Sequence, residues 1–210
     1  MKNTFYKKKS IIRFNNGEKK KLNDYIVEEI KTNVKSNFFP EFTLTSSPWD
    51  IEELALGAAY NRGFIKEKKY KETNNKLKIT KEKVIEFVKE LESTSDLFIK
   101  TGGVHNAFLC TNNEILCRKN DIGRHNVIDR IAGFALINNI SLQDKIIVFS
   151  GREPFEIIDK IKRMKIKIFI SVAAPTTMGI ELAKDAGITL IGFARGNKFN
   201  VYTNSNRVIF

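Results

Sequence analysis

Three short apolar runs in the C-terminal half of the chain restrict its fold more than any other feature. They cover residues 145–149, 168–172 and 188–193, and most of their residues are β-branched or aromatic. Each run has the length of a buried strand, and the stretches between them carry apolar residues at helical spacing. Strands that alternate with helices in this way predict an α/β fold with a mainly parallel sheet covered by helices on both faces.

The N-terminal part of the chain has a different pattern. Residues 1–15 alternate enough to predict a strand that runs into a turn at Asn15-Asn16-Gly17. Further strands are expected at 25–27 and 42–44. Apolar residues then recur at helical spacing and predict a helix over 51–61.

A run of charged and polar residues at 66–75 is typical of a linker or an exposed excursion. We therefore expect a small α+β domain over residues 1–70 and a second domain over residues 71–210. The second domain is also expected to contain a helix at 81–91, a hairpin with strands 107–110 and 115–118, a helix at 178–186 and a final hairpin strand at 199–203.

Polar loops follow each of the three apolar runs. They contain Ser150-Gly151-Arg152, Pro175-Thr176-Thr177 and Arg195-Gly196-Asn197-Lys198, and a fourth cluster at 121–126 precedes a helix. Ligands collect at the carboxyl ends of strands in such sheets, and helix N-termini attract anions. The four loops therefore predict one anionic pocket, whose charges are Arg124, Arg152 and Arg195. Asp121 and Asn126 have an alternative role as helix caps.

The net charge of +12 is the unusual feature of the composition. It favours a polyanionic partner, although Lys-, Asn- and Ile-rich usage that reflects genome base composition is an alternative cause. The lysine clusters lack an aromatic–basic stacking motif, which argues against nucleic acid. The N-terminus lacks the apolar core of a signal peptide, and no apolar run could span a membrane. We expect a cytoplasmic protein that does not enter a membrane.

Several motifs together resemble one known family. They are Glu53-Leu54-Ala55-Leu56-Gly57, Thr101-Gly102-Gly103-x-His105, Asp121-x-Gly123-Arg124-His125-Asn126-x-x-Asp129, Ser150-Gly151-Arg152 with Phe155-Glu156, Ala174-Pro175-Thr176 and Gly192-Phe193-x-Arg195. Their order is that of FdhD, the formate dehydrogenase accessory sulfurtransferase family. The resemblance covers roughly residues 45–205 and rests on several independent motifs.

The resemblance implies a fold, a ligand and partners. The fold is a small N-terminal domain packed on a three-layer, cytidine-deaminase-like domain, usually in a homodimer. The ligand is the molybdenum bis(molybdopterin guanine dinucleotide) cofactor, for which a guanine nucleotide is a surrogate. Sulfur would come from a cysteine desulfurase and pass to the cofactor before the cofactor enters formate dehydrogenase.

The family assigns the stretch that matches Phe193–Lys198 to cofactor binding, which agrees with the strand-end position of Arg195. The full set of residues expected at the cofactor is Phe193, Ala194, Arg195, Gly196, Asn197, Lys198, Gly102, Gly103, His105, Gly123, Arg124, His125, Asn126, Ser150, Gly151, Arg152, Pro175 and Thr176. The glycines at 102, 103, 151 and 196 would let a ligand approach the backbone closely.

The chain departs from the family at its sulfur-carrying motif. The family has a CxxC loop in the interval that corresponds to residues 66–100, and this interval contains no cysteine. Cys110 and Cys117 are the only thiols and hence the candidate substitutes for catalysis. If the hairpin turns at Asn112-Asn113, both cysteines lie on one face, roughly 7–8 Å apart. The alternative, which we favour, is two small buried apolar side chains.

No metal site is expected. A deaminase zinc site needs His-x-Glu and Pro-Cys-x-x-Cys, and neither pattern is present around His105 or His125. The histidines are expected to hydrogen-bond the cofactor or to support the loops. Asp121 and Asp129 are expected to act as a helix cap and as an arginine partner, for example of Arg124.

The sequence supports two main hypotheses of function. The first is an FdhD-like sulfur carrier that binds the cofactor and supports formate dehydrogenase maturation. The second is a non-catalytic cofactor-binding chaperone that lost sulfur transfer with the CxxC, so whether the chain is an enzyme stays open. A third reading, a basic nucleic-acid-binding protein, would require binding that is independent of the pocket arginines.

Overall fold

A six-stranded sheet forms the centre of the molecule in the computed structural model, which describes residues 5–66, 77–93 and 95–210. The strand order is β11-β10-β9-β8-β6-β7. The bounds are β6 (His105–Cys110), β7 (Ile115–Asp121), β8 (Ile146–Phe149), β9 (Ile168–Ser171), β10 (Thr189–Arg195) and β11 (Lys198–Val201). The three apolar runs of the sequence are β8, β9 and β10, so these predicted strands are confirmed.

The sheet is mixed, and the prediction of a mainly parallel sheet is wrong. β8 pairs in parallel with β9, and β9 with β10. The β6–β7, β6–β8 and β10–β11 pairings are antiparallel. The cause is the two hairpins: a short turn can only return the chain antiparallel, and β6 then lies between β7 and β8.

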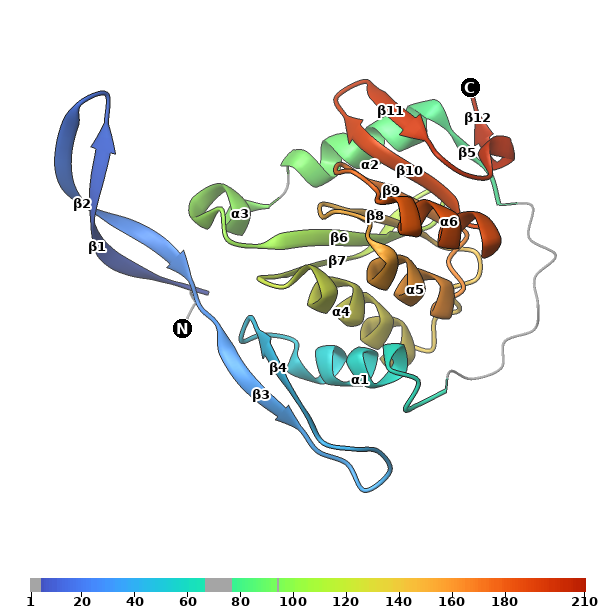
Figure 1. Ribbon diagram of the computed structural model, residues 1–210, viewed down its shortest axis with the longest axis horizontal. Helices are drawn as coiled ribbons and strands as arrows, with labels where there is room; N and C mark the ends of the chain where they lie inside the picture. The colour runs from blue at the N-terminus through green and yellow to red at the C-terminus, as the bar shows by residue number, and fades with distance from the viewer. Residues whose placement is uncertain (1–4, 67–76, 94) are drawn as a thin grey trace.

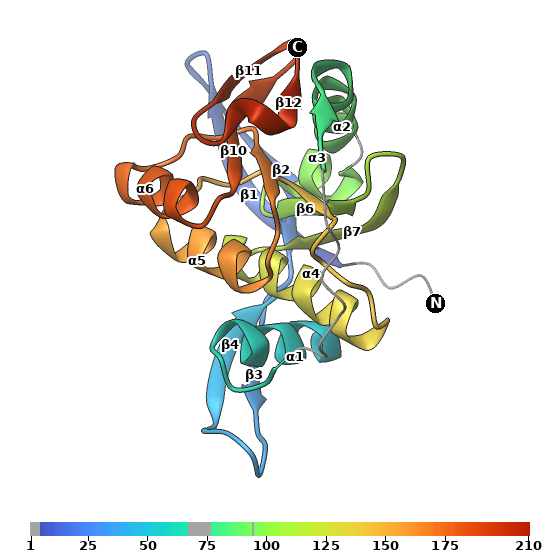
Figure 2. The same cartoon turned by 90° about the vertical axis from the view of Figure 1, so that its right-hand side faces the viewer.

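Helices cover both faces of the sheet, as predicted (Figures 1 and 2). On one face lies α2 (Lys81–Ser93), and on the other lie α4 (Arg124–Ile137), α5 (Phe155–Arg163) and α6 (Thr177–Asp185). The alternation of β8 explains the two cores: Ile146 and Val148 pack in the cluster with α2, whereas Ile147 and Phe149 pack in the cluster with α4, α5 and α6.

The N-terminal part forms two hairpins and one helix. They are β1 (Tyr6–Asn15) with β2 (Glu18–Val27), β3 (Ile30–Val34) with β4 (Phe42–Ser46), and α1 (Ile51–Asn61). The predicted first strand, its turn and the helix are confirmed. β2 is longer than expected, and β3 was missed. The smaller elements are β5 (Ile79–Thr80), α3 (Asp96–Thr101), the 3-10 turn η1 (Ser205–Arg207) and β12 (Val208–Ile209).

α1 lies directly against α4, and two glycines make this contact possible. A Cβ atom on Gly57 would lie 1.7 Å from the carbonyl oxygen of Asp129, and one on Gly133 would lie 1.8 Å from that of Glu53. The two helix backbones therefore touch. Most of the predicted linker lies outside the described residues, and the division at residue 70 stays a prediction.

A buried ion pair joins this N-terminal segment to the sheet. Arg130 and Asp121 are both 0% exposed, and Nη2 of Arg130 lies 2.6 Å from Oδ2 of Asp121. Arg130 also donates to the carbonyl oxygens of Ser47, Trp49 and Asp50. The pair therefore holds the turn between β4 and α1 against the end of β7.

Glu153 is also a buried carboxyl group but, unlike Asp121, it has no counter-charge in the part of the chain that the structure describes. Its residue is 0% exposed, and neither carboxyl oxygen has a hydrogen-bond partner among the described residues. The group lies beside Gly192 and Pro175, at the carboxyl ends of the strands. Burial raises the pKa of Glu153 well above its ordinary value, so we infer that the side chain is neutral at pH 7.

The glycine contact predicts the effect of a single methyl group. Gly133→Ala should lower the free energy of unfolding by about 3 kcal/mol, because the added Cβ meets the backbone of Glu53 and not a movable side chain. Helix propensity alone would give the opposite sign, a gain of about 0.5–1 kcal/mol. Urea unfolding measures the difference, and a stabilised variant would show that the helices are not in contact.

The neutral Glu153 predicts a pH-dependent effect. Above about pH 4.5 the unfolded chain loses this proton while the folded chain keeps it, so folding stability falls as the pH rises towards the raised pKa. Glu153→Gln cannot titrate. The variant should therefore melt at a higher temperature than the native protein at pH 7.5 but not at pH 4.

Glu156→Gln provides the control, because Glu156 is exposed in the first turn of α5. Its melting temperature should follow that of the native protein at both pH values. An equal shift of Glu153→Gln at pH 4 and pH 7.5 would contradict the proton-dependent explanation.

Candidate functional site

The polar loops predicted to meet at one edge of the sheet do so. β7, β8, β9 and β10 end at this edge, and β6, which runs in the opposite direction, begins there. His105 is paired directly with Asp121 in the β6–β7 ladder. Along the edge, the order is Arg195, then 172–176, then Ser150–Arg152, then 103–105, and finally 121–124 (Figure 1).

A pocket of about 420 Å³ opens at this edge beside α2 and α3. Its lining includes four residues from the predicted set, namely Gly102, Gly103, His105 and Ser150. Sequence reasoning missed the contribution of α3 and of the end of α2, which are Leu91, Glu92, Ser95 and Phe98. Ser95 could have predicted the start of α3 from the sequence, because serine is a common N-cap residue. In the structure its Oγ accepts a hydrogen bond from the Phe98 N–H and caps α3.

His105 and Ser150 are held together by the backbone of β6. Ser150 Oγ accepts a hydrogen bond of 2.8 Å from the Asn106 N–H and lies 3.4 Å from Nδ1 of His105. Burial and, secondly, the Arg124 guanidinium lower the pKa of His105. We infer that His105 is neutral at pH 7, so its ring can both donate and accept one hydrogen bond.

Arg124 begins α4, and its Nε is buried without a partner among the described residues. The predicted pairing of Arg124 with Asp121 or Asp129 is wrong. Asp121 pairs with Arg130, and Asp129 pairs with Lys160, whose Nζ lies 2.7 Å away. The reason is helical spacing, because Arg130 lies well inside α4 and reaches back to the start of the helix. Arg124 therefore keeps donor capacity for a ligand.

The cluster at 121–126 divides into ligand-facing and structural parts. Asn126 donates to the Thr45 carbonyl oxygen and to Oδ1 of Asp121, so its amide fastens β4 to the loop. A Cβ on Gly123 would lie 2.8 Å from this amide. Burial lowers the pKa of His125, followed by the charges of Lys160 and Arg124. His125 therefore belongs to the α4–α5 side and not to the pocket.

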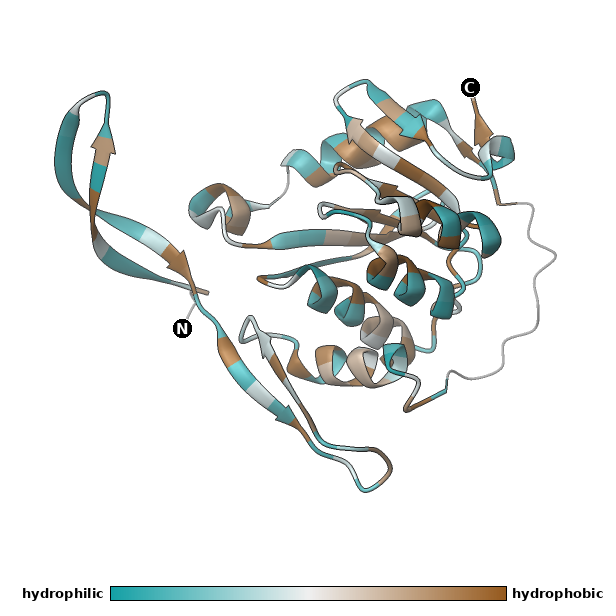
Figure 3. Cartoon of the chain, viewed as in Figure 1, coloured by the Kyte–Doolittle hydropathy of each residue, from teal (hydrophilic) through white to brown (hydrophobic). Residues whose placement is uncertain are grey.

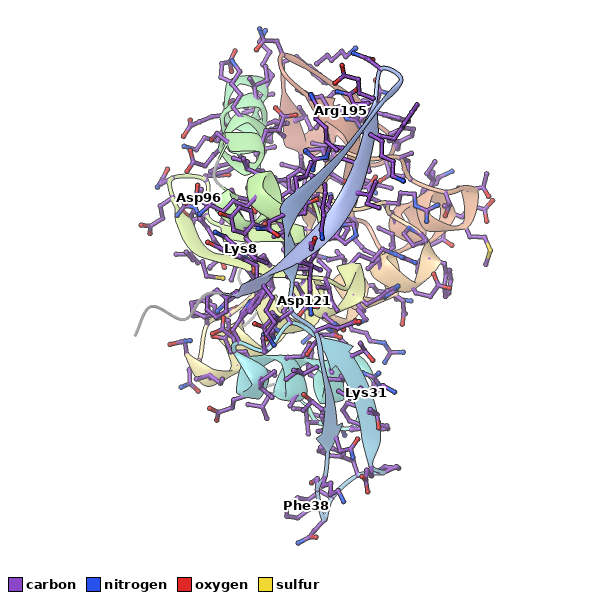
Figure 4. The ribbon with its side chains drawn as sticks, turned by 90° about the vertical axis from the view of Figure 1, so that its left-hand side faces the viewer. Lys8, Lys31, Phe38, Asp96, Asp121 and Arg195 are labelled. Atoms are coloured by element: carbon purple, nitrogen blue, oxygen red, sulfur yellow. The ribbon has the colours of Figure 1, made fainter. Side chains whose placement is uncertain are left out.

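The three arginines are spread along the edge and do not line the 420 Å³ pocket. Arg195 and Arg152 are exposed. Nε of Arg195 donates to the Val172 carbonyl oxygen at 2.7 Å, which leaves its Nη groups free of partners in the described structure. Figure 4 shows Arg195 and Asp121 well apart across this side of the molecule. The arrangement is thus a row of cations rather than one cluster.

The glycines of the site differ in what surrounds them. Gly102 and Gly196 have φ of 62° and 56°, and nothing lies within 4 Å of an added Cβ. At Gly103 and Gly151, by contrast, the space is filled by Val27 and by the Phe149 ring. Only the first two leave room for a ligand to approach the backbone.

The strand-end loop of β10 has an irregular backbone. Phe193 adopts a left-handed conformation with φ of 50° and is exposed, in a register shift between Gly192 and Arg195. Ala194 is buried, whereas Asn197 and Lys198 are exposed. Nearby, Thr176 caps α6 through its Oγ1, and Pro175 forms a bridge with Glu153.

The two cysteines lie on opposite faces of the sheet, which corrects the expectation that they share one face. Cys110 pairs with Ile115 as predicted, but a register shift follows, and Cys117 pairs with Leu109. Cys110 consequently packs in the cluster with α2, and Cys117 packs against the other cluster. Burial raises the pKa of both thiols, that of Cys117 to about 12. Neither is an activated nucleophile.

The described ranges contain no group of three or more His, Cys, Asp or Glu side chains able to hold a metal ion. None of the helices in these ranges is long and apolar enough to cross a membrane. What the edge offers is a line of guanidinium and lysine donors, a neutral histidine and two open glycines. Such groups bind phosphates and polar heterocycles.

Comparison with known proteins shows which family the chain resembles. The FdhD/NarQ family is matched over residues 66–209. Sulfur carrier protein FdhD of Bacillus subtilis (strain 168) is 31% identical over 252 residues of alignment, which cover 95% of this chain and 96% of that protein. That of Geobacillus kaustophilus (strain HTA426) is 44% identical over 125 residues, 60% of this chain and 48% of that protein.

The fold also has a counterpart among crystal structures. A formate dehydrogenase accessory protein from Desulfotalea psychrophila superposes with a TM-score of 0.88 over 98% of this chain and 100% of that chain. The two sequences are 22% identical, so this likeness concerns the fold. With the family matched over most of its length, the chain belongs to the FdhD/NarQ family.

Proposed function

We propose that this chain binds the molybdenum bis(molybdopterin guanine dinucleotide) cofactor at the carboxyl edge of its sheet and serves formate dehydrogenase maturation. The observation that supports this most is the row of unpaired cationic groups along the edge, in particular Arg195 and the buried Nε of Arg124. The names of the relatives, sulfur carrier and formate dehydrogenase accessory proteins, point to the same process.

The residues present are suited to such a ligand. Arg195 and Lys198 would bind phosphates of the guanine dinucleotide, and the open space at Gly196 would admit them close to the backbone. Arg124 and the neutral His105 would hydrogen-bond the polar heterocycle or further phosphates near the 420 Å³ pocket. The cofactor itself would supply the molybdenum centre; the chain would bind and orient it.

The finer expectations belong to the same proposal. We assign the three layers to the cytidine-deaminase-like class, and we expect a homodimer and a cysteine desulfurase as sulfur donor. Support for the class comes from the sheet order, with helices on both faces. The donor and the dimer rest on the family resemblance alone.

A non-catalytic cofactor-binding chaperone is the second candidate, and the thiols favour it. The chain has two cysteines; Cys110 is buried, Cys117 is partly buried, and burial raises the pKa of both thiols. The alignment with the Bacillus subtilis protein is also longer than this chain (252 − 210 = 42), so that relative has at least 42 residues opposite gaps. A shortened chain of this kind fits the absence of a CxxC loop.

Binding of guanosine diphosphate tests the cofactor site. We expect the native chain to bind it and Arg195→Ala to weaken the affinity by roughly ten- to a hundredfold, the effect of losing a charge-assisted hydrogen bond. Isothermal titration calorimetry at moderate salt measures both affinities. Arg163→Ala is the matched control, because it removes the same charge from α5, where Arg163 pairs with Asp159.

Absence of guanosine diphosphate binding would end the proposal. An equal loss of affinity in Arg163→Ala and Arg195→Ala would mean that net charge, and not the strand-end loop, determines binding.

Incubation with a cysteine desulfurase and free cysteine tests the second candidate. We expect intact-mass analysis to find no sulfur added to the native chain, because a thiol with a pKa near 12 is roughly one part in a hundred thousand thiolate at pH 7. The Bacillus subtilis relative, treated in parallel, provides the positive control. Added sulfur that disappears in Cys110→Ala or Cys117→Ala would contradict the chaperone candidate. It would show that the chain carries sulfur on a cysteine outside the family's CxxC position.

A further inference from the structure

The hairpin of β1 and β2 projects from the molecule as a two-stranded arm (Figure 1). Its base touches the body: Val27 lies against Gly103, and Lys100 lies over the Tyr6 ring. Within the part of the chain that the structure describes, the distal half, from Ser10 to Asn23, forms no hydrogen bond, ion pair or ring contact with the body. A two-stranded hairpin alone is marginally stable in water. A partner surface would account for an arm of this length.

The register divides the arm into two faces that differ in charge. Cross-strand partners share a face, so Lys8–Tyr25, Ile12–Lys21 and Phe14–Lys19 lie on one face. We call it the cationic face. Ion pairs occupy the other face, where Arg13 pairs with Asp24, and Lys20 with Glu18. Figure 3 shows that hydrophilic residues make up most of the arm, with a few hydrophobic residues among them.

The cationic face combines unpaired lysines with exposed apolar side chains. Lys8, Lys19 and Lys21 form no ion pair within the described residues, and neither carboxylate of the two strands lies on this face. Ile12 is 63% exposed and Phe14 is 73% exposed. Positive charge around an apolar centre is complementary to an acidic surface with apolar side chains of its own.

The outer edges of both strands are unpaired as well, because among the described residues β1 and β2 form a two-stranded sheet. Such an edge presents a row of N–H and C=O groups that an extended peptide can pair with. A ladder of main-chain hydrogen bonds needs a peptide partner; a lipid surface would not provide one. The distal half of the cationic face carries one aromatic ring, that of Phe14, whereas proteins that bind single-stranded nucleic acid stack successive bases on several rings.

We propose that the arm binds an extended acidic segment of a partner protein by strand addition, with the carboxylates of the segment on Lys19 and Lys21 and its apolar side chains on Ile12 and Phe14. The same arm of a second copy is less suited as occupant, because it would bring Lys19 and Lys21 of two cationic faces together. This interaction is separate from the strand-end site and does not depend on the cofactor.

The probe is a synthetic peptide of about ten residues, the length of β1. Threonine alternates in it with glutamate or valine, so that one face of the extended peptide carries both carboxylates and apolar groups. Fluorescence anisotropy measures its binding to the full chain. A version with alternate backbone amides methylated cannot form the ladder, and we expect it not to bind.

Two neighbouring lysines provide matched variants. Lys21→Glu on the cationic face should weaken peptide binding by at least about tenfold, whereas Lys20→Glu, with the same change of charge on the other face, should weaken it by less than about threefold. Phe14→Ser should also weaken binding by at least about tenfold. These side chains are exposed, so thermal unfolding should match that of the native chain.

Four results would overturn the proposal. Equal losses of peptide affinity in Lys20→Glu and Lys21→Glu would mean that net charge alone determines binding. Unchanged binding of the methylated peptide would exclude strand addition. Binding of anionic vesicles or RNA in place of the peptide would assign the face to another class of partner. Dissociation of a dimer by Phe14→Ser in sedimentation equilibrium would identify a second copy as the occupant.

Discussion

The buried pair of Arg130 and Asp121 is the interaction on which the arrangement of the site depends. Removing two charges from water is unfavourable, and it is tolerated when every remaining donor and acceptor is satisfied. Here the guanidinium also binds three carbonyl oxygens of the turn before α1, and the carboxylate accepts from the Gly123 and Ser47 backbones. One pair thus fixes the entry into α1, the end of β7 and the start of α4.

Two of the buried polar groups that have no partner among the described residues lie close to that fixed frame. Arg124 lies six residues before Arg130 on the same helix, and the carboxyl group of Glu153 lies at the same edge of the sheet. Leaving a buried polar group unpaired destabilises a fold by about 1–3 kcal/mol. Asp121 has hydrogen-bond partners for both carboxylate oxygens, whereas the nearby Arg124 has an Nε that is unpaired in the described structure. The unused hydrogen-bonding capacity therefore lies at the surface where a ligand would bind.

Hydrophobic periodicity was sufficient to predict the core of the fold. Residues 145–149, 168–172 and 188–193 are recognisable as strands because each is mostly apolar, and nearly all of their residues are buried. The same reasoning located the strand-end loops. It could not decide partners, since Arg124 and Arg130 are equally plausible counter-charges for Asp121 until the helix fixes their directions. Nor could it foresee the neutral Glu153, whose state depends on burial by residues distant in the sequence.

The register of the β6–β7 hairpin was the second feature that the sequence did not predict correctly. The turn at Asn112-Asn113 correctly gave the pairing of Cys110, yet a single-residue shift moved Cys117 to the opposite face. Alternation has a period of two, so one extra residue inverts every later assignment. Bulges of this kind leave little trace in a sequence whose neighbouring positions are all apolar.

The interior position of both thiols has a practical consequence. Cys110 is buried, Cys117 is partly buried, and burial raises the pKa of both thiols, so we expect the folded chain to react slowly with alkylating reagents. A single cysteine introduced on an exposed residue should then take a fluorophore or a spin label faster than Cys110 and Cys117. The packing of both thiols against the sheet therefore makes the chain suitable for site-specific labelling.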